Sequence, residues 1–82
     1  MSSLVKIYST SWCVYCRMAK EYFNSKNVDF EEVDVEHDRS KALELVERTG
    51  QAGVPVIDIG DETILGFDRE RIDLALRRHK LI

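Results

Sequence analysis

The 82 residues are 44% hydrophobic and 33% charged, a composition typical of a folded globular protein and not of a disordered chain. The net charge of −3 argues against a nucleic-acid partner, because phosphate binding needs a basic surface. No apolar run approaches the ~20 residues that span a bilayer, and the first residues lack the basic-then-apolar order of a secretory signal. We therefore expect a single domain over residues 1–82, working in the cytoplasm and away from membranes.

The first elements alternate between strand and helix. A β-branched and aromatic run predicts a strand over 4–8, and apolar residues at helical spacing predict a helix that opens at Cys13 and ends in the segment 24–27. A second strand is expected over 28–35. Asp38 can cap a second helix, and Gly50 is a suitable stop for it.

The remaining elements begin with a nearly continuous apolar run, which predicts a strand over 54–59 that is covered on both faces. A turn at 60–61 leads to a hairpin strand over 63–65. Asp68 can cap a last helix, whose inner face is Ile72, Ala75, Leu76 and His79. The order β-α-β-α-β-β-α predicts an α/β fold with a four-stranded mixed sheet flanked by three helices.

The two cysteines, Cys13 and Cys16, lie at the expected start of the first helix. A bridge across so short a loop removes little chain entropy, so the pair is a poor structural staple. A structural zinc needs four ligands, and the other candidates, His37 and His79, are expected in a solvated loop and at the end of a helix. The cysteine spacing therefore favours redox chemistry over a structural role.

The position of the pair assigns a role to each sulfur. A helix N-terminus favours a thiolate, and the pKa of cysteines there falls to roughly 3.5–7.5 from about 8.5. The thiolate is the attacking species in disulfide exchange. We expect Cys13 to be the nucleophile and Cys16, one turn deeper, to resolve the mixed disulfide. No metal site is expected.

Pro55 stands near the start of the third strand, where proline is tolerated. Since X–Pro bonds in folded proteins are cis in only about 5–6% of cases, the base rate alone predicts a trans Val54–Pro55 bond.

Three motifs carry a resemblance to a known family: Cys13-Val14-Tyr15-Cys16, Gly53-Val54-Pro55 and Leu65-Gly66-Phe67-Asp68. In order and spacing they resemble the glutaredoxin family over the whole chain. The resemblance implies a thioredoxin-like fold and a dithiol oxidoreductase that reduces protein disulfides or glutathione mixed disulfides as an electron carrier. It also implies a cis Val54–Pro55 bond that faces the dithiol, with the Val54 backbone exposed to substrate.

The same resemblance implies a substrate and glutathione site, with no tightly bound cofactor and with glutathione as a candidate co-substrate. Gln51 matches a position that holds the glycine carboxylate. The segment Gly66-Phe67-Asp68 matches the loop that receives the γ-glutamyl end, where backbone N–H groups suit a carboxylate. The whole implied binding set is Tyr15, Gln51, Val54, Pro55, Gly66, Phe67 and Asp68.

Three positions depart from the glutaredoxin pattern. Thr10 stands where a lysine is frequent, Arg69 where an acidic residue is usual, and Val14 where a proline is common. Val14 and the Gly66-Phe67 pair are similar to NrdH-type redoxins, which thioredoxin reductase recharges. The partners implied are disulfide-containing proteins, with glutathione or thioredoxin reductase as the electron source, and the departures favour the reductase.

One alternative to a monomeric enzyme stays open. A dimer could carry an iron–sulfur cluster, because such clusters take four thiolate ligands and each chain has two cysteines.

Overall fold

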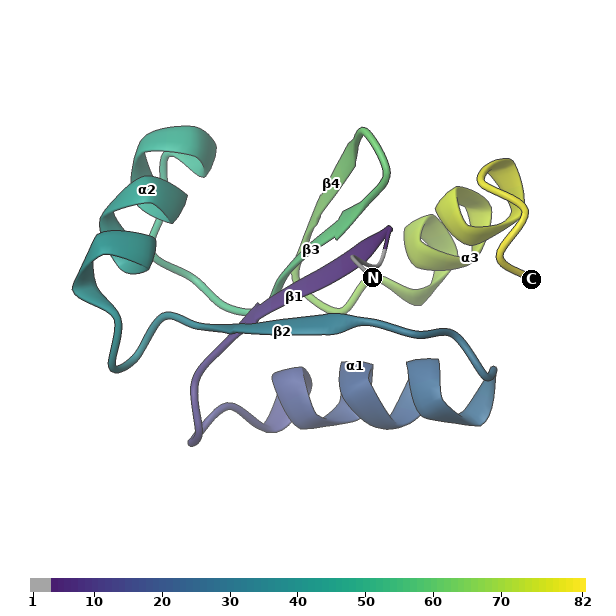
Figure 1. The fold of residues 1–82 in the computed structure, drawn as a ribbon, viewed down its shortest axis with the longest axis horizontal. Helices are drawn as coiled ribbons and strands as arrows, with labels where there is room; N and C mark the ends of the chain where they lie inside the picture. The colour runs from purple at the N-terminus through teal and green to yellow at the C-terminus, as the bar shows by residue number, and fades with distance from the viewer. Residues whose placement is uncertain (1–3) are drawn as a thin grey trace.

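The computed structural model describes residues 4–82. Along this part of the chain the elements are β1 (Val5–Ser9), α1 (Val14–Ser25), β2 (Glu31–Asp34), α2 (Arg39–Thr49), β3 (Val56–Ile59), β4 (Glu62–Leu65) and α3 (Arg69–Arg78). The strands form one sheet in the order β2-β1-β3-β4 (Figure 1). Strand β1 runs parallel to β2 and antiparallel to β3, and β4 is antiparallel to β3. The predicted element order and mixed sheet are confirmed.

Two strands are shorter than predicted. The strand expected over 28–35 is reduced to β2, an exposed edge strand, because the Val28 amide donates to the Phe23 carbonyl at 2.9 Å and so closes α1. The strand expected over 54–59 begins at Val56, since Pro55 has no N–H to give to a ladder. Its predicted burial is confirmed, because Val56, Ile57 and Ile59 have no exposed surface.

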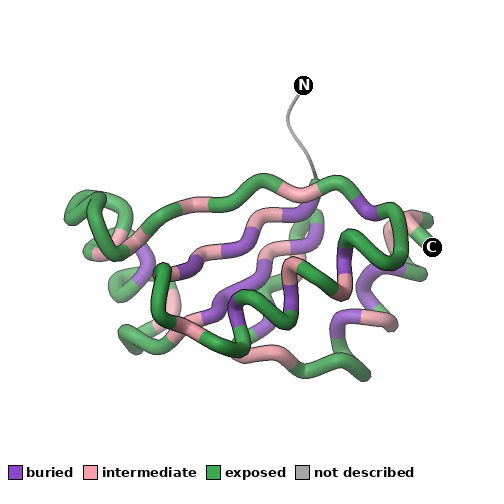
Figure 2. The backbone as a smooth tube through the Cα atoms, turned by 90° about the horizontal axis from the view of Figure 1, so that it is seen from below, coloured by how far each residue is buried: buried purple, intermediate pink, exposed green. Residues whose placement is uncertain are grey.

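The main core lies on one face of the sheet. Ile57 of β3 pairs with Ile7 of β1 on one side and with Ile64 of β4 on the other, so their side chains form one apolar band. Helices α1 and α3 cover this band, and the alternation of buried and half-buried residues along the strands is visible in Figure 2. The helix residues in this core are Ala19, Phe23, Ile72, Ala75 and Leu76.

Helix α2 lies away from this core, and Leu45 is the one residue of the helix that is buried. Its main polar attachment is Arg48, whose guanidinium stands 5.3 Å from the Tyr8 ring centre and 3.0 Å from the Asp58 carboxylate. Desolvation raises the pKa of Tyr8. The second face of the sheet is therefore held by a stacked cation and an ion pair more than by apolar packing.

The helix ends follow the predicted capping residues. Asp38 accepts a hydrogen bond from the Lys41 amide at 3.1 Å, and Asp68 accepts one from the Arg71 amide at 3.3 Å. Gly50 closes α2 with a left-handed φ of 76°. His79 is the C-cap of α3, as expected for a residue at the end of a helix, and its ring lies 3.3 Å from Glu62. Within residues 4–82 no helix is long and apolar enough to cross a membrane.

Candidate functional site

Cys13 is the N-cap of α1. Its backbone is extended, with φ −86° and ψ 112°, and its Sγ accepts a hydrogen bond from the Cys16 amide at 3.1 Å. A side chain that caps a helix in this way is usually an oxygen of Ser, Thr, Asp or Asn. Here a half-exposed sulfur takes that place, where free N–H groups and the helix dipole stabilise negative charge.

Cys16 lies one turn further along α1 and is fully buried. Desolvation, aided by the hydrogen bond with Cys13, raises the pKa of the Cys16 thiol to about 12. Cys16 therefore keeps its proton at neutral pH. Both cysteines are reduced in this structure. The predicted difference between an outer and an inner sulfur is present in the geometry.

A carboxylate holds the loop before Cys13. Both the amide and the hydroxyl of Ser11 donate to Glu36 Oε1, at 3.0 and 2.6 Å. These bonds hold the pKa of Glu36 below its usual value, so it is ionised at neutral pH. Strands β1 and β2 are parallel with Ser9 opposite Asp34, and the residues that follow them therefore meet.

A second carboxylate takes up a cation near the dithiol. Lys20, which the sequence places one turn beyond Cys16, donates to Glu32 at 2.7 Å, and Ser9 donates to the same oxygen at 2.6 Å. The hydrogen bond from Lys20 is the main cause of the lowered Glu32 pKa. Arg17 is exposed. Most of the positive charge beside the cysteines is therefore balanced or solvated.

The peptide bond between Val54 and Pro55 is cis. The resemblance to glutaredoxins predicted this isomer, and the trans prediction from base rates was wrong. Pro55 is buried, and its carbonyl accepts a hydrogen bond from the Gly66 amide at 2.8 Å. This bond joins the loop of the predicted γ-glutamyl site to the cis proline.

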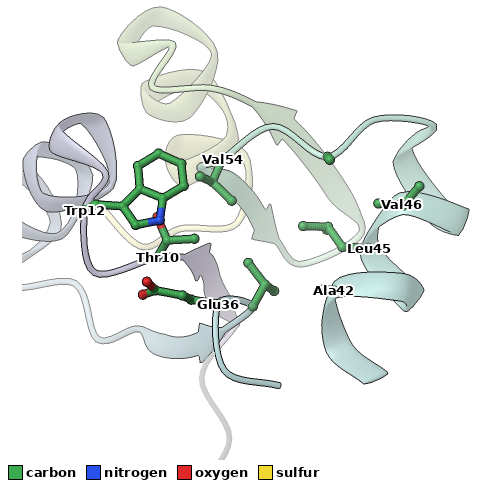
Figure 3. Close-up of a pocket in the computed structure, with 9 residues that line it drawn as sticks. Thr10, Trp12, Glu36, Ala42, Leu45, Val46 and Val54 are labelled. Carbon is green, nitrogen blue, oxygen red and sulfur yellow. The ribbon is translucent and has the colours of Figure 1, made fainter. Parts of the chain in front are cut away.

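A pocket of about 310 Å³ opens beside this loop (Figure 3). We call it the Trp12 pocket, and its lining residues are Thr10, Trp12, Val35, Glu36, Ala42, Leu45, Val46, Ala52 and Val54. In Figure 3 the Trp12 indole lies across Thr10 toward Val54, and the Glu36 carboxylate lies on the same side. The pocket thus joins the loop before Cys13 to the residue before Pro55.

The other predicted binding residues differ in burial and in the contacts that they make. Gln51 is exposed just past α2. Its side-chain nitrogen lies 3.8 Å from the position that a Cβ would take if Gly53 had one. Phe67 packs edge-on against Tyr22, with ring centres 6.1 Å apart. Tyr15 is 61% exposed in the first turn of α1. Asp68 uses its carboxylate to cap α3.

The two departures from the glutathione pattern differ in their surroundings. Thr10 is half-buried, and within residues 4–82 its hydroxyl has no hydrogen-bond partner. Arg69 is exposed, with its guanidinium 4.5 Å from the centre of the Tyr22 ring. Tyr22 in turn donates to Asp73. Arg69 is therefore held by a cation–π contact.

Sequence reasoning missed the Ser11–Glu36 contact, the Lys20–Glu32 pair and the Trp12 pocket. Parallel pairing of the strands around 4–8 and 28–35 was a usable signal for the first, since the carboxyl ends of parallel neighbours lie at one edge. Neither histidine gathers with the cysteines. Each lies with two carboxylates, His37 beside Asp34 and Glu36, and His79 beside Asp61 and Glu62.

Comparisons with known proteins agree on one family. The Glutaredoxin family model matches residues 5–64. An uncharacterised glutaredoxin-like 8.6 kDa protein from the rubredoxin operon of Clostridium pasteurianum is 41% identical over 75 residues, covering 92% of this chain and 100% of that protein. The glutaredoxin structure from Archaeoglobus fulgidus has a TM-score of 0.82 at 25% identity, covering 92% of this chain and 87% of that one.

A further solved structure is the NrdH-redoxin of Escherichia coli, described as a glutaredoxin-like protein with a thioredoxin-like activity profile. It has a TM-score of 0.74 at 28% identity and covers 85% of this chain and 91% of that one. The predicted thioredoxin-like fold is confirmed by these structures.

Proposed function

Because the chain belongs to the glutaredoxin family of thiol–disulfide oxidoreductases, we propose that it works by a dithiol cycle in which Cys13 attacks and Cys16 resolves. The observation that carries this assignment is the Cys13 sulfur at the cap of α1, half-exposed and bonded to the Cys16 amide. The raised pKa of buried Cys16 supports it, because a protonated thiol does not compete as the first nucleophile.

The cycle moves two electrons from the protein to its substrate. The Cys13 thiolate attacks one sulfur of the substrate disulfide and expels the other as a thiolate, which takes up a proton. Cys16 then loses its proton and attacks the Cys13 sulfur of the mixed disulfide. This step forms the Cys13–Cys16 bond and releases the second substrate thiol. In our proposal the backbone of Val54 pairs with the substrate while the exchange proceeds.

Serine variants of the two cysteines test the assignment. Cys13→Ser should abolish disulfide reduction, because no thiolate remains at the cap. Cys16→Ser should accumulate a mixed disulfide that mass spectrometry detects on Cys13. A mixed disulfide trapped on Cys16 in the Cys13→Ser protein, with turnover retained, would reverse the assignment.

We further propose that the electrons come from a flavoprotein of the thioredoxin reductase class and that glutathione binds weakly. Thr10 offers no cation to a glycine carboxylate, and the Glu36 carboxylate in the same pocket would repel it. Arg69 replaces a carboxylate that would pair with the ammonium of glutathione. The reductase supplies electrons in the reducing cytoplasm, where dithiols are kept reduced.

A coupled NADPH assay separates the two electron sources. Turnover with thioredoxin reductase should exceed turnover with glutathione and glutathione reductase at equal protein concentration. Fast turnover with glutathione and none with thioredoxin reductase would overturn this part of the proposal and leave the dithiol cycle intact.

The iron–sulfur alternative has less support. Cys16 is buried, so each chain would present one exposed thiolate to a cluster that takes four ligands.

A further inference from the structure

The Trp12 pocket is apolar apart from Thr10 and one charged residue, Glu36. At about 310 Å³ it is at the small end of ligand pockets, which suits a single side chain better than a cofactor. Two apolar residues at its mouth are left in water, with Trp12 69% and Val46 40% exposed. Exposed apolar surface gathered around a hollow marks a place where a partner docks.

The edge of this pocket is negatively charged. Glu36 Oε1 takes both hydrogen bonds from Ser11, and within residues 4–82 its Oε2 makes no hydrogen bond. A neighbouring hollow shares Thr10 and Glu36 with the pocket and adds the Asp34 and Glu32 carboxylates. Lys20 balances Glu32, and His37 lies 2.9 Å from Asp34. Glu36 is the carboxylate that lines both hollows, and the His37 ring, hydrogen-bonded to Asp34, lies within 4.8 Å of it.

The pocket is lined by chain neighbours of both the reacting cysteine and the cis proline. Trp12 is the residue before Cys13, and Val54 is the residue before the cis proline, so one wall is next to the proposed nucleophile and another is the residue whose backbone is proposed to pair with substrate. A polypeptide that pairs with Val54 and delivers its disulfide to Cys13 would pass the pocket within one or two residues of its cysteine.

We propose that the Trp12 pocket selects protein substrates by taking one apolar side chain next to the substrate cysteine, while Glu36 pairs with a lysine or arginine that flanks the same cysteine. The proposal rests on the dithiol function and names the substrate class of that same site: a disulfide flanked by an apolar and a basic residue. Apolar burial supplies the affinity, and the carboxylate discriminates against acidic sequences.

Single-turnover kinetics with pre-reduced protein tests this without any reductase. The substrates are disulfide-linked homodimers of three end-blocked tripeptides, Leu-Cys-Lys, Leu-Cys-Glu and Ser-Cys-Lys, and acid quenching followed by mass spectrometry measures each rate. The Leu-Cys-Lys dimer should react about three- to tenfold faster than either of the others at low salt. The advantage of lysine over glutamate should shrink as salt rises.

Two variants assign the preferences to the pocket. Glu36→Gln should remove the preference for lysine over glutamate, and Val46→Ser, at an exposed position, should reduce the preference for leucine over serine. Matched controls are Glu47→Gln and Leu43→Ser on α2, which are exposed and outside the pocket and should leave both preferences unchanged. Hydroxyethyl disulfide, which has no side chain for the pocket, should react equally with the parent and the two control variants, and for each pocket variant it gives the reference rate by which the peptide rates are divided.

Each contrary outcome has a distinct meaning. Equal rates with the three peptides, or a lysine preference that survives in Glu36→Gln, would overturn the pocket proposal while reduction of hydroxyethyl disulfide kept the dithiol function. No reduction of hydroxyethyl disulfide would overturn both. A dimer of the unmodified protein in sedimentation, lost in Val46→Ser, would mean that a second copy fills the pocket, and would also overturn it.

Discussion

Cys13 and Cys16 are the same residue type three positions apart, and their surroundings divide the chemistry between them. One sulfur replaces the usual oxygen of a helix cap and meets water. The other is enclosed by the core, which penalises its charged form. In the proposed cycle the order of the exchange steps follows from burial and helix geometry.

The raised pKa of Cys16 predicts selective alkylation. At pH 7 iodoacetamide should modify Cys13 and leave Cys16 intact, because the Cys16 thiol titrates at about 12. In the Cys13→Ser protein the Cys16 pKa should fall, since the contributions of Cys13 are lost, yet stay above its ordinary value because burial is the largest cause. Mass spectrometry of the alkylated peptides across pH 6–11 measures both rates. Faster alkylation of Cys16 than of Cys13 near neutral pH would contradict the assignment.

The raised pKa of Cys16 also fixes the direction in which the stability of the protein changes with pH. A thiol whose pKa is raised in the native state favours folding below its unfolded pKa of about 8.5, and this contribution is lost as pH rises above that value. The unmodified protein should therefore lose stability above pH 8.5 more steeply than Cys16→Ser, as urea unfolding would measure.

Restoring two glutathione contacts should raise glutathione-dependent turnover. Charge-assisted contacts contribute about 1.5–3 kcal/mol where they are desolvated and much less at an exposed rim. Thr10 is half-buried and Arg69 exposed, so Thr10→Lys should contribute most of a gain that ranges from a few-fold to a few hundred-fold in the double variant with Arg69→Asp. The coupled glutathione reductase assay, run at low and high salt, measures it. A double variant no better than the parent would show that these two positions do not limit glutathione use.

At the scale of the elements, local chemistry predicted the helix starts. Asp38 and Asp68 each stand before a helical pattern and accept the amide three residues on, as capping residues do. Strand ends were less predictable. Val28 has a β-forming side chain, but its backbone completes the turn after α1, and no local pattern distinguishes that use from a ladder.

Two glycines with positive φ offer a matched test of the turns. Gly50 after α2 has φ 76° and open space where a Cβ would stand, whereas at Gly60, with φ 60°, a Cβ would overlap the His79 ring. Gly50→Ala should cost about 1–2 kcal/mol of unfolding free energy from backbone strain alone. Gly60→Ala should cost more, and the excess should disappear in a His79→Ala background. Urea denaturation of the parent, the two glycine variants, His79→Ala and the Gly60→Ala/His79→Ala double variant measures these costs. Equal costs at the two glycines would mean that the ring moves aside freely.

At the scale of the whole molecule, the radius of gyration of 11.9 Å matches the roughly 12 Å expected for a globular chain of this length. The core is one-sided, with α1 and α3 on the apolar band and α2 opposite (Figure 1). The sequence predicted a sheet flanked by helices but did not assign each helix to a face. The cysteine pair was predictable from its spacing, but the cis proline needed the family resemblance, because the local preference of the peptide is trans.

The Trp12 pocket could not be predicted in the same way. Its walls come from segments around 10–12, 35–36, 42–46 and 52–54, and each segment has an ordinary local pattern. Only the fold brings them together. The local pattern of each segment therefore does not predict the cavity that the segments form together.

Native-state hydrogen exchange should rank the helices by their contact with the core. Helices α1 and α3 each bury three residues, whereas α2 buries Leu45 alone. Amides of α2 should therefore exchange through openings of lower free energy than the central amides of the other two helices. Exchange measured by NMR tests this at each residue. Equal protection of all three helices would imply that the Arg48 contacts anchor α2 as firmly as apolar packing does.

A weakly anchored α2 also makes one wall of the Trp12 pocket compliant. Ala42, Leu45 and Val46 belong to this helix, whereas Thr10, Trp12 and Val54 are joined to the sheet and the cysteine loop. A small local displacement of α2 would change the pocket's breadth without disturbing the dithiol or the core behind it. The reacting sulfur would then lie in the rigid part of the protein. The pocket wall that adapts to different apolar side chains would be formed by α2, which moves more easily.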